Sequence, residues 1–362
     1  MVRVTFDGRR FSLRDDERAL DALLRGGADV RFSCRRGVCH ACLLRAVDGD
    51  PGADAQRGLS PSQRAEGYIL PCLARPRTDL SLARLDPSAL FVRAELRARQ
   101  AVTPDIVRLR LETECNLAWR PGQYVNLRHP DGAVRSYSLA SLAEEDGYLD
   151  LYVRRFDGGR MSPWLCDDLR EDDGVELQGP HGRCHYDPAH RDRPLLLLAT
   201  GSGLGALVGV ARDALMQGHR GGIWLYHGVR DASGRFLTNT LRALEAQHEG
   251  FHFVPCVSRG SAPDDAAAGR VTDVAFARHT DLGGWAVYLC GLPEMVYDAR
   301  VLAVEAGVAR SDLRTDAFEP VHPAPPDDAA RLARLGPQPA LWQALREGPG
   351  LTEILEDFYT RA

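Results

Sequence analysis

At 362 residues the chain is longer than one hydrophobic core usually supports, which predicts two or three domains. Its composition, 44% hydrophobic and 26% charged, is typical of a globular protein and excludes the disordered and fibrous classes. The formal net charge of -5 and the lack of a block of basic residues argue against nucleic acid as a partner.

Nothing in the sequence indicates a membrane segment or an export signal. Apolar runs such as Leu195 to Ala199 are far too short to cross a bilayer, and residues 1–6 lack the core of a signal peptide. The nine cysteines are an odd number spread along a long chain, which favours metal ligands and reduced thiols over disulfides. We therefore expect a cytoplasmic protein with no membrane partner.

The first 85 or so residues have the pattern of a small α+β unit. Residues 2–6 alternate as a strand does, a turn follows at Asp7-Gly8, and residues 19–24 have the pattern of a helix. From residue 80 to residue 91 the pattern weakens, which predicts a connection to a second module.

The middle of the chain is rich in short strands separated by turns, which predicts an antiparallel barrel. The expected strands cover residues 107–111, 123–127, 137–139 and 149–153.

From Leu195 onward the pattern changes to strands that alternate with helices. An apolar strand ends in a glycine loop, a helix is expected over 207–216, and further buried strands are expected at 223–226 and 287–289. This alternation predicts a parallel α/β sheet.

Four cysteines carry the strongest chemical signal. Cys34, Cys39 and Cys42 lie in one loop, separated by four and then two residues, and Cys72 could close the site from a distant segment. Thiolates favour iron-sulfur clusters and zinc over hard cations, and plant-type iron-sulfur proteins have this spacing. The alternatives are a zinc site and an ordinary set of buried thiols. Zinc sites usually show two short cysteine pairs, and the second pair is missing, so we favour the cluster.

His40 lies inside the cysteine loop and is a candidate ligand of a Rieske centre. Rieske centres need a histidine in both halves of the site, and nothing near Cys72 supplies the second one. We therefore expect His40, Arg35 and Arg36 near the exposed edge of a cluster, where they could contact an acidic acceptor, although plain solvated arginines are the simpler interpretation. Gly37 fits a backbone that must fold closely around sulfide.

The loop from Cys34 to Cys42 and the string around Cys72 resemble the cluster site of plant-type ferredoxins. The resemblance implies a ferredoxin-like β-grasp domain over residues 1–88. Its metal ligands to a 2Fe-2S cluster would be Cys34, Cys39, Cys42 and Cys72.

In the barrel region, the string from Arg135 to Ser138 places a guanidinium and the ring of Tyr137 on one face of a strand. This pair suits a cation that holds a pyrophosphate beside a ring packed on isoalloxazine, although a plain cross-strand pair would give the same string. The later string from Gly158 to Leu165 offers glycines, a hydroxyl and a helix start whose amides can hold phosphates.

These two strings, following Pro121 to Val125, resemble the flavin domain of the ferredoxin reductase family. The resemblance implies an FAD-binding antiparallel β-barrel over residues 89–190, with Ser138 also taking part in catalysis. Its cofactor-binding residues would be Arg135, Tyr137, Ser138, Tyr152, Gly159, Met161 and Ser162.

Two strings in the second half of the chain each run from a strand through a tight turn into a helix. In the first, Leu198 to Gly205, the amides would point at a phosphate, with added attraction from the helix dipole. The second, Tyr288 to Val296, resembles the nicotinamide-side motif of the same family, in which a cysteine lies near the hydride-carrying carbon. That catalytic role would fall to Cys290, although a buried cysteine at a strand end is the plainer interpretation.

The resemblance implies a Rossmann-like α/β domain that binds NAD over residues 191–320. Its cofactor-binding residues would be Thr200, Gly201, Gly203, Leu204, Cys290, Gly291, Met295 and Phe318.

The choice between NADH and NADPH depends on residues after the strand at 223–226, which would lie near the adenine ribose. Asp231 could pair with ribose hydroxyls, whereas Arg230 or Arg235 could meet the extra phosphate of NADPH. We favour NADH and leave NADPH open.

The order of the three modules resembles the reductase component of multicomponent oxygenases, such as the benzoate dioxygenase and methane monooxygenase systems, over about residues 1–320. The resemblance implies an NAD(P)H-dependent oxidoreductase that passes a hydride to FAD and single electrons through a 2Fe-2S cluster to an oxygenase or another redox acceptor. A carrier protein that has lost its flavin site is a different interpretation, which absorbance spectra would distinguish.

Residues 321–362 combine a proline-rich linker with two amphipathic stretches. The second, Leu351 to Tyr359, resembles the opening helices of truncated haemoglobins, although no proximal histidine follows before Ala362. The alternative function is therefore the electron-supplying part of a fusion with a haem domain that carries out oxygen or nitric oxide chemistry. We favour such a fusion remnant over helices that dock on the reductase or on a partner.

Overall fold

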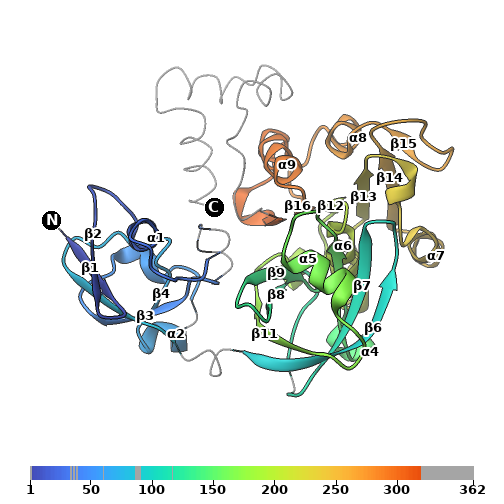
Figure 1. Ribbon diagram of the computed structural model, residues 1–362. Coiled ribbons are helices and arrows are strands. Elements are labelled where there is room, and N and C mark those ends of the chain that lie inside the picture. Colours follow the sequence, from blue (N-terminus) through green and yellow to red (C-terminus); the bar gives the residue numbers. More distant parts are fainter. Residues whose placement is uncertain are drawn as a thin grey trace. The chain divides into compact units, whose positions relative to one another are not determined.

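The computed structural model describes residues 2–32, 35, 37, 40–59, 61–85, 91–115 and 117–318. The chain divides into two compact units between Gly182 and Arg183. Both are coloured along the chain in Figure 1. In the part of the chain described, no helix has the length and apolarity needed to cross a membrane.

The first unit begins with a five-stranded sheet, which we call the cysteine module (residues 2–85) and whose strand order is β2-β1-β5-β3-β4. Helix α1 (Ala19–Arg25) buries Ala19, Leu20, Ala22 and Leu23, because these positions share one face of a helix. The expected strand and helix are therefore confirmed. The other elements are β1 (Arg3–Phe6), β2 (Arg9–Ser12), β3 (Leu44–Asp48), β4 (Tyr68–Ile69), β5 (Leu80–Ala83), α2 (Pro61–Ala65) and the 3-10 turn η1 (Ala53–Gln56).

The expectation of a connection from residue 80 was wrong for residues 80–83. Strand β5 is the central strand of the sheet, parallel to β1 and antiparallel to β3. Only Leu80 and Leu82 are buried, so the alternating pattern spans four residues and is too short to stand out in the sequence. The formation of β5 is therefore determined by its long-range pairing with β1 and not by the local propensity of its residues.

The second part of this unit is an antiparallel barrel (residues 91–181) with strand order β10-β7-β6-β11-β8-β9. A bridge between Leu139 and Leu151 joins the edges β9 and β10. The barrel prediction is confirmed, but the two strands β6 and β11 had not been expected from the sequence. The strands are β6 (Val92–Ala101), β7 (Ile106–Thr113), β8 (Tyr124–Arg128), β9 (Val134–Ser138), β10 (Leu149–Arg154) and β11 (Gly174–His181). The short helices are α4 (Ala143–Asp146), α5 (Met161–Pro163) and the π turn η2 (Trp164–Asp168).

The second unit is built on a six-stranded sheet with strand order β15-β14-β13-β12-β16-β17, in which every pair is parallel. The strands are β12 (Leu195–Thr200), β13 (Ile223–Val229), β14 (Phe251–Val257), β15 (Ala267–Ala268), β16 (Ala286–Gly291) and β17 (Leu313–Ala317). The helices are α6 (Gly203–Met216), α7 (Thr238–Gln247), α8 (Val271–Arg278) and α9 (Pro293–Glu305), with 3-10 turns η3 (Pro188–His190), η4 (Ala232–Gly234) and η5 (Arg310–Asp312).

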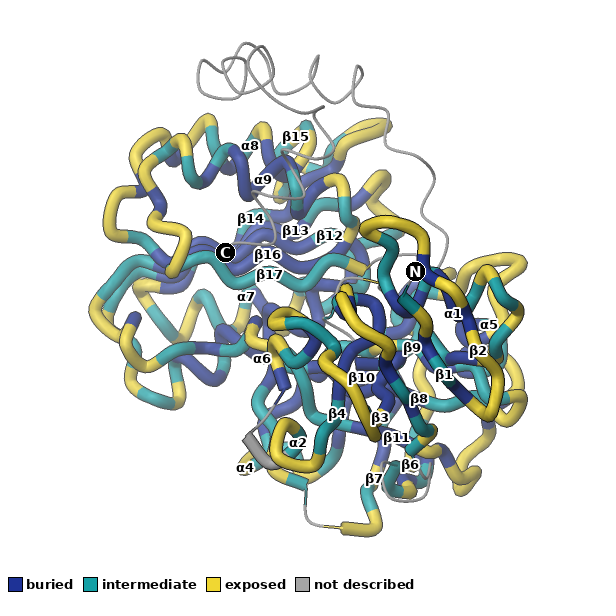
Figure 2. Tube along the Cα trace, turned by 90° about the vertical axis from the view of Figure 1, so that its left-hand side faces the viewer, coloured by how far each residue is buried: buried dark blue, intermediate teal, exposed yellow. Residues whose placement is uncertain are grey.

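The core of this second unit explains its parallel arrangement. The four leucines of β12 are fully buried, as expected for a strand covered on both faces. Figure 2 shows β12, β13 and β16 in dark blue at the centre of the unit. The predicted α/β sheet is confirmed, and α6 begins at Gly203, four residues earlier than the pattern had indicated.

The segment directly after Gly182 packs within the second unit. The Tyr186 hydroxyl lies 3.0 Å from Nδ1 of His219, and Nδ1 of His190 lies 3.0 Å from the Tyr288 hydroxyl. These bonds satisfy buried polar groups, so Tyr186 and His190 anchor the segment 183–190 in the core of this unit.

We predict that the stability of the second unit decreases in mild acid because of His219. Burial lowers the pKa of His219 from 6.5 to about 4. Between these values the unfolded chain binds a proton that the folded chain does not, so the free energy of unfolding falls as the pH falls from about 6.5 to about 4. The expected loss for this group is about 1–3 kcal/mol.

Thermal unfolding midpoints at neutral pH and at mildly acidic pH test this prediction in the wild-type chain and in His219→Gln. Glutamine can still bond the Tyr186 hydroxyl but cannot titrate, so the variant should lose less stability in acid. Equal losses in the two proteins would contradict the assignment.

Candidate functional site

The cysteine module brings the Cys72 turn close to the start of α1. The amides of Ala19 and Leu20 donate to the carbonyls of Ala74 and Pro71 at 2.9 and 3.0 Å. Because the loop that carries Cys42 follows α1, these bonds hold the two cysteine segments in one module. The Cys42 and Cys72 side chains are both buried, with 4% and 1% of their surface exposed. Cys34, Cys39 and Arg36 lie outside the described residues.

The described residues fit a small cluster held between two thiolate segments. Gly37 has a φ of +75°, and a Cβ at this position would lie 2.7 Å from Cγ of Leu73. The cysteine loop therefore packs tightly on Leu73, the residue that follows Cys72. Such close packing is needed if the loop and the Cys72 segment are to enclose one cluster. Buried soft sulfur donors suit a 2Fe-2S cluster.

The expectation that His40 lies at an exposed edge was wrong. Its ring is 8% exposed and contacts the ring of His181 in β11, with 4.9 Å between the ring centroids. Burial lowers the pKa of His40 to about 4 and that of His181 to about 3, so both rings are neutral at physiological pH. His181 also contacts the ring of Tyr124, at 5.6 Å. These contacts join the cysteine loop to the barrel within the first unit.

A cavity of about 340 Å³ lies beside this contact and is lined by both parts of the first unit. His40 and Cys42 line it from the cysteine loop, and Val134 and Gln178 line it from the barrel. Arg35, by contrast, is exposed, and its guanidinium forms an ion pair with Asp21.

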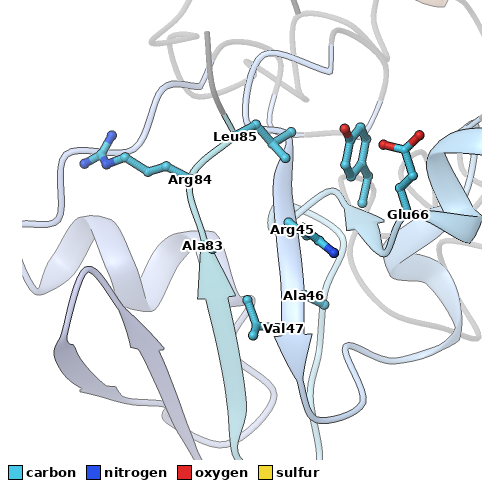
Figure 3. A pocket seen from close by; sticks show the side chains of 8 residues that line it. Arg45, Ala46, Val47, Glu66, Ala83, Arg84 and Leu85 are labelled. Carbon is cyan, nitrogen blue, oxygen red and sulfur yellow. The ribbon is translucent and has the colours of Figure 1, made fainter. Parts of the chain in front are cut away.

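A second hollow lies on the cysteine module, at the edge of β3 and β5 (Figure 3). Neither Cys42 nor Cys72 lines it, and a hydrogen bond to Glu66, with burial second, raises the pKa of the Tyr68 hydroxyl there. We assign no cofactor to this hollow. It is lined by Arg45, Ala46, Val47, Glu66, Tyr68, Ala83, Arg84 and Leu85.

The flavin candidates gather where β9 meets β10. The Leu139–Leu151 bridge is antiparallel, so Ser138, which precedes Leu139, and Tyr152, which follows Leu151, lie next to each other across it. Arg135 and Tyr137 lie on β9, and Tyr137 packs on the barrel core that includes Met161. Burial raises the pKa of Tyr137, so its hydroxyl stays protonated.

The remaining flavin candidates lie in the turn after β10. The amide of Phe156 donates to Oγ of Ser162 at 3.0 Å, and a Cβ on Gly159 would lie 3.1 Å from the Phe156 carbonyl oxygen. Arg160 forms an ion pair with Asp131 in the β8–β9 turn, which ties the start of α5 to the strand that carries Arg135. The seven predicted flavin residues thus lie on β9, on β10 and in the segment that follows β10. Their residue types suit a flat ring beside a phosphate-binding turn, and their role in binding flavin stays a prediction.

The dinucleotide candidates lie at the carboxyl ends of β12 and β16, where the strand order of the sheet reverses. Such a switch point is where open parallel sheets bind ligands. A Cβ on Gly203 would lie 2.6 Å from the Cys290 carbonyl oxygen, and a Cβ on Gly291 would lie 2.5 Å from the Thr200 carbonyl oxygen. The two loops therefore meet backbone to backbone, and only glycine permits this approach.

Hydrogen bonds from one side chain and from the backbone reinforce this junction. The Leu292 amide donates to Oγ1 of Thr200 at 2.8 Å, and the Phe318 amide donates to the Gly291 carbonyl at 2.8 Å. The Leu204 amide donates to the Gly201 carbonyl in the turn into α6, and Met295 is buried in the first turn of α9. The predicted residues around Thr200 and Gly291 are thus together at one edge.

Cys290 is fully buried, and its pKa is raised well above the ordinary value because burial disfavours the thiolate. The residue is therefore a neutral thiol and not a nucleophile.

One residue at this edge, His227 in β13, had not been identified from the sequence. It is buried, and its Nε2 lies 3.2 Å from the Gly201 carbonyl oxygen. In the sequence, His227 could be noticed only as a polar residue near the end of an apolar strand. Many buried histidines without a functional role have the same position.

Three family models match the chain in the order of these sites. The 2Fe-2S iron-sulfur cluster binding domain matches residues 3–77, the oxidoreductase FAD-binding domain matches residues 93–186, and the oxidoreductase NAD-binding domain matches residues 197–301. The chain is also 38% identical over 307 residues to the reductase subunit of an aromatic O-demethylase from an Amycolatopsis species, covering 81% of this chain and 91% of the relative. The chain belongs to the reductase components of oxygenase systems.

Other relatives agree with this assignment. The reductase component of the naphthalene 1,2-dioxygenase system of Pseudomonas putida is 29% identical and covers 83% of this chain and 93% of its own. A crystal structure of an Amycolatopsis cytochrome P450 reductase is 33% identical, with a TM-score of 0.65 over 89% of this chain and 100% of the other.

The comparisons confirm the order of a ferredoxin module, a flavin barrel and a dinucleotide domain. The reductase is therefore an oxidoreductase that uses NAD(P)H, FAD and a 2Fe-2S cluster. The resemblance of the tail to a truncated haemoglobin concerns residues 321–362, which lie outside the described residues.

We predict that Gly203→Ala disrupts the dinucleotide edge. Alanine has a higher helix propensity than glycine, so propensity alone would stabilise the first turn of α6. Any loss of stability or activity therefore reports the clash with the Cys290 carbonyl. Unfolding should become easier by about 1–3 kcal/mol. Reduction of ferricyanide by NADH should slow by about tenfold or more. A tenfold change in rate corresponds to about 1.4 kcal/mol in the activation free energy.

Gly250→Ala is the matched control, because the nearest atom to its Cβ would be 3.9 Å away. The control should behave as the wild type does. If Gly203→Ala reduced ferricyanide with NADH at the wild-type rate, the close approach of the two loops would not be needed for dinucleotide use, and the prediction would be wrong.

Proposed function

We propose that this reductase takes electrons from a nicotinamide dinucleotide and delivers them singly, through its cysteine loop, to a separate oxygenase component. The observation that carries the proposal is the presence in one chain of a dinucleotide edge, a flavin region and two buried cluster thiols. When bound, FAD accepts a hydride, and the 2Fe-2S cluster exchanges single electrons. The relatives named as reductase components of oxygenase systems support the separate acceptor.

In this proposal the residues of the chain hold and orient the two groups. Cys42 and Cys72, with Cys34 and Cys39, supply thiolates to the cluster. Arg135 supplies positive charge for the flavin pyrophosphate, and the Tyr137 ring lies against the flavin. Ser138 and Tyr152 flank the bridge where the flavin would lie.

Cys290 has a different role in the proposal. Its buried neutral thiol keeps water from the carboxyl end of β16 while the nicotinamide lies there.

For the acceptor we infer a haem-containing monooxygenase that acts on an aromatic substrate. The support is the identity of 38% to the reductase subunit of an aromatic O-demethylase, together with full coverage of the cytochrome P450 reductase structure. We place the pair in the cytoplasm, because thiolate ligands stay reduced in such a compartment. A haem domain fused to residues 321–362 remains the alternative hypothesis.

We predict that Cys72→Ser separates the two halves of the electron path. Loss of one thiolate ligand should remove the cluster, so reduction of cytochrome c by NADH should slow. Mutating a residue that only hydrogen-bonds a metal ligand already lowers activity by about tenfold or more, so removing the ligand itself should lower the rate by at least that factor. Reduction of ferricyanide directly from the flavin should persist. Cys115→Ser, at an exposed cysteine, is the control. Equal loss of both activities in Cys72→Ser, with flavin still bound, would rule out the proposed route.

The acceptor class has its own test. The purified reductase and NADH should reduce a bacterial cytochrome P450 O-demethylase, as the carbon monoxide difference spectrum reports, and should reduce a Rieske-type oxygenase more slowly. The reverse order of rates would exclude the haem acceptor while leaving the path through the cluster intact.

A further inference from the structure

Arg235 follows the strand that in this kind of fold leads to the adenine ribose. Strand β13 lies beside β12, with Gly228 opposite Thr200, and the Gly201 amide donates to the Gly228 carbonyl at 3.3 Å. The loop after β13 is therefore attached to the dinucleotide edge. In dinucleotide folds an acidic residue here binds the ribose hydroxyls of NADH, whereas an arginine binds the additional 2′-phosphate of NADPH.

The Arg235 guanidinium is held by Asp265, in the loop between β14 and β15. Nη1 of Arg235 donates to Oδ1 of Asp265 at 2.9 Å, and Nη2 donates to Oδ2, so the pair is bidentate. Only 12% of the Arg235 side chain is exposed. The Asp265 side chain is 46% exposed, so the strength of the pair comes from its bidentate geometry and from the buried guanidinium.

Asp265 is itself held in place by the scaffold. Arg242 of α7 donates to the Asp265 carbonyl at 3.0 Å and to the Phe253 carbonyl of β14 at 3.0 Å. Arg235 lowers the pKa of the Asp265 carboxyl, mainly through their hydrogen bond, so the carboxylate stays charged at neutral pH. The carboxylate is thus a fixed competitor for any phosphate that approaches Arg235.

We propose that Asp265 makes the reductase selective for NADH by binding the guanidinium that would otherwise bind the 2′-phosphate of NADPH. The inference rests on the proposed function, because it places the adenine ribose at the end of β13. Asp231, whose carboxylate accepts bonds from the amide and the hydroxyl of Ser233, supplies negative charge at the same loop and disfavours a second phosphate further. Arg230 is exposed and adjacent to Asp231 in the chain.

The test compares two adenosine fragments in the full-length holoprotein, 5′-AMP and 2′,5′-ADP, by titration calorimetry. In the wild type, 5′-AMP should bind at least as tightly as 2′,5′-ADP. Asp265→Asn keeps the size of the side chain and removes its charge, so the dissociation constant of 2′,5′-ADP should fall by about tenfold, which corresponds to one charge-assisted hydrogen bond. The dissociation constant of 5′-AMP should stay within about twofold, because no bond to it changes.

Two further variants make the result specific. Asp264→Asn, at the neighbouring exposed carboxylate, should change neither affinity. Adding Arg235→Ala to Asp265→Asn should remove the gain for 2′,5′-ADP. With ferricyanide as acceptor, kcat/KM for NADPH should follow the same order among these proteins.

Three results would overturn the inference: a wild type that prefers 2′,5′-ADP, an Asp265→Asn variant without any gain, or a gain that persists in the double variant. Failure of the proposed function would look different, because neither fragment would bind and neither dinucleotide would reduce ferricyanide.

Discussion

The meeting of two backbones at the carboxyl ends of β12 and β16 is the constraint on which the dinucleotide edge depends. The strand order reverses between these two strands, so the helices that follow them, α6 and α9, lie on opposite faces of the sheet while their first turns start side by side. Glycines at positions 203 and 291 remove the Cβ atoms that would keep the loops apart, and the Thr200 hydroxyl bonds the amide of Leu292 across the junction. The close approach of the two loops and the strand order together produce a surface rich in backbone amides. No single charged side chain is needed for it.

Arginine supplies many of the bonds between loops and strands in the second unit. Every basic side chain of the sequence is arginine, with no lysine. Arg193 donates to the carbonyls of Gly284 and Trp285 and to the Asp312 carboxylate at 2.7, 2.9 and 2.7 Å. One planar guanidinium can make several such bonds at once, whereas an ammonium group has a smaller reach and no fixed fork. The pair of Arg235 and Asp265 uses the same property.

In the first unit, aromatic and imidazole rings join the cysteine loop to the barrel. His40 contacts His181, and His181 contacts Tyr124, which pairs with Ser138 of β9. Residues of the cysteine loop and of the flavin region are therefore connected by three successive contacts. The two imidazoles are neutral because burial in a low-dielectric surrounding penalises the charged form.

The sequence by itself determined the features that are encoded within short windows. Cysteine spacing, the two strings that run from strand through turn into helix, and the Arg135–Ser138 strand all report chemistry that neighbouring residues supply together, so they predicted the three modules and most of their candidate residues. Strand β5 was missed because its four residues carry too little periodicity, and only its pairing with β1 and β3 identifies it.

Only the tertiary structure decided the environment of single residues. His40 is buried because His181, 141 positions later in the chain, covers it. Arg235 is occupied because the β14–β15 loop brings Asp265 to it. Spacing along the chain carries no information about such partners, since contacts between distant segments form only when the sheets assemble.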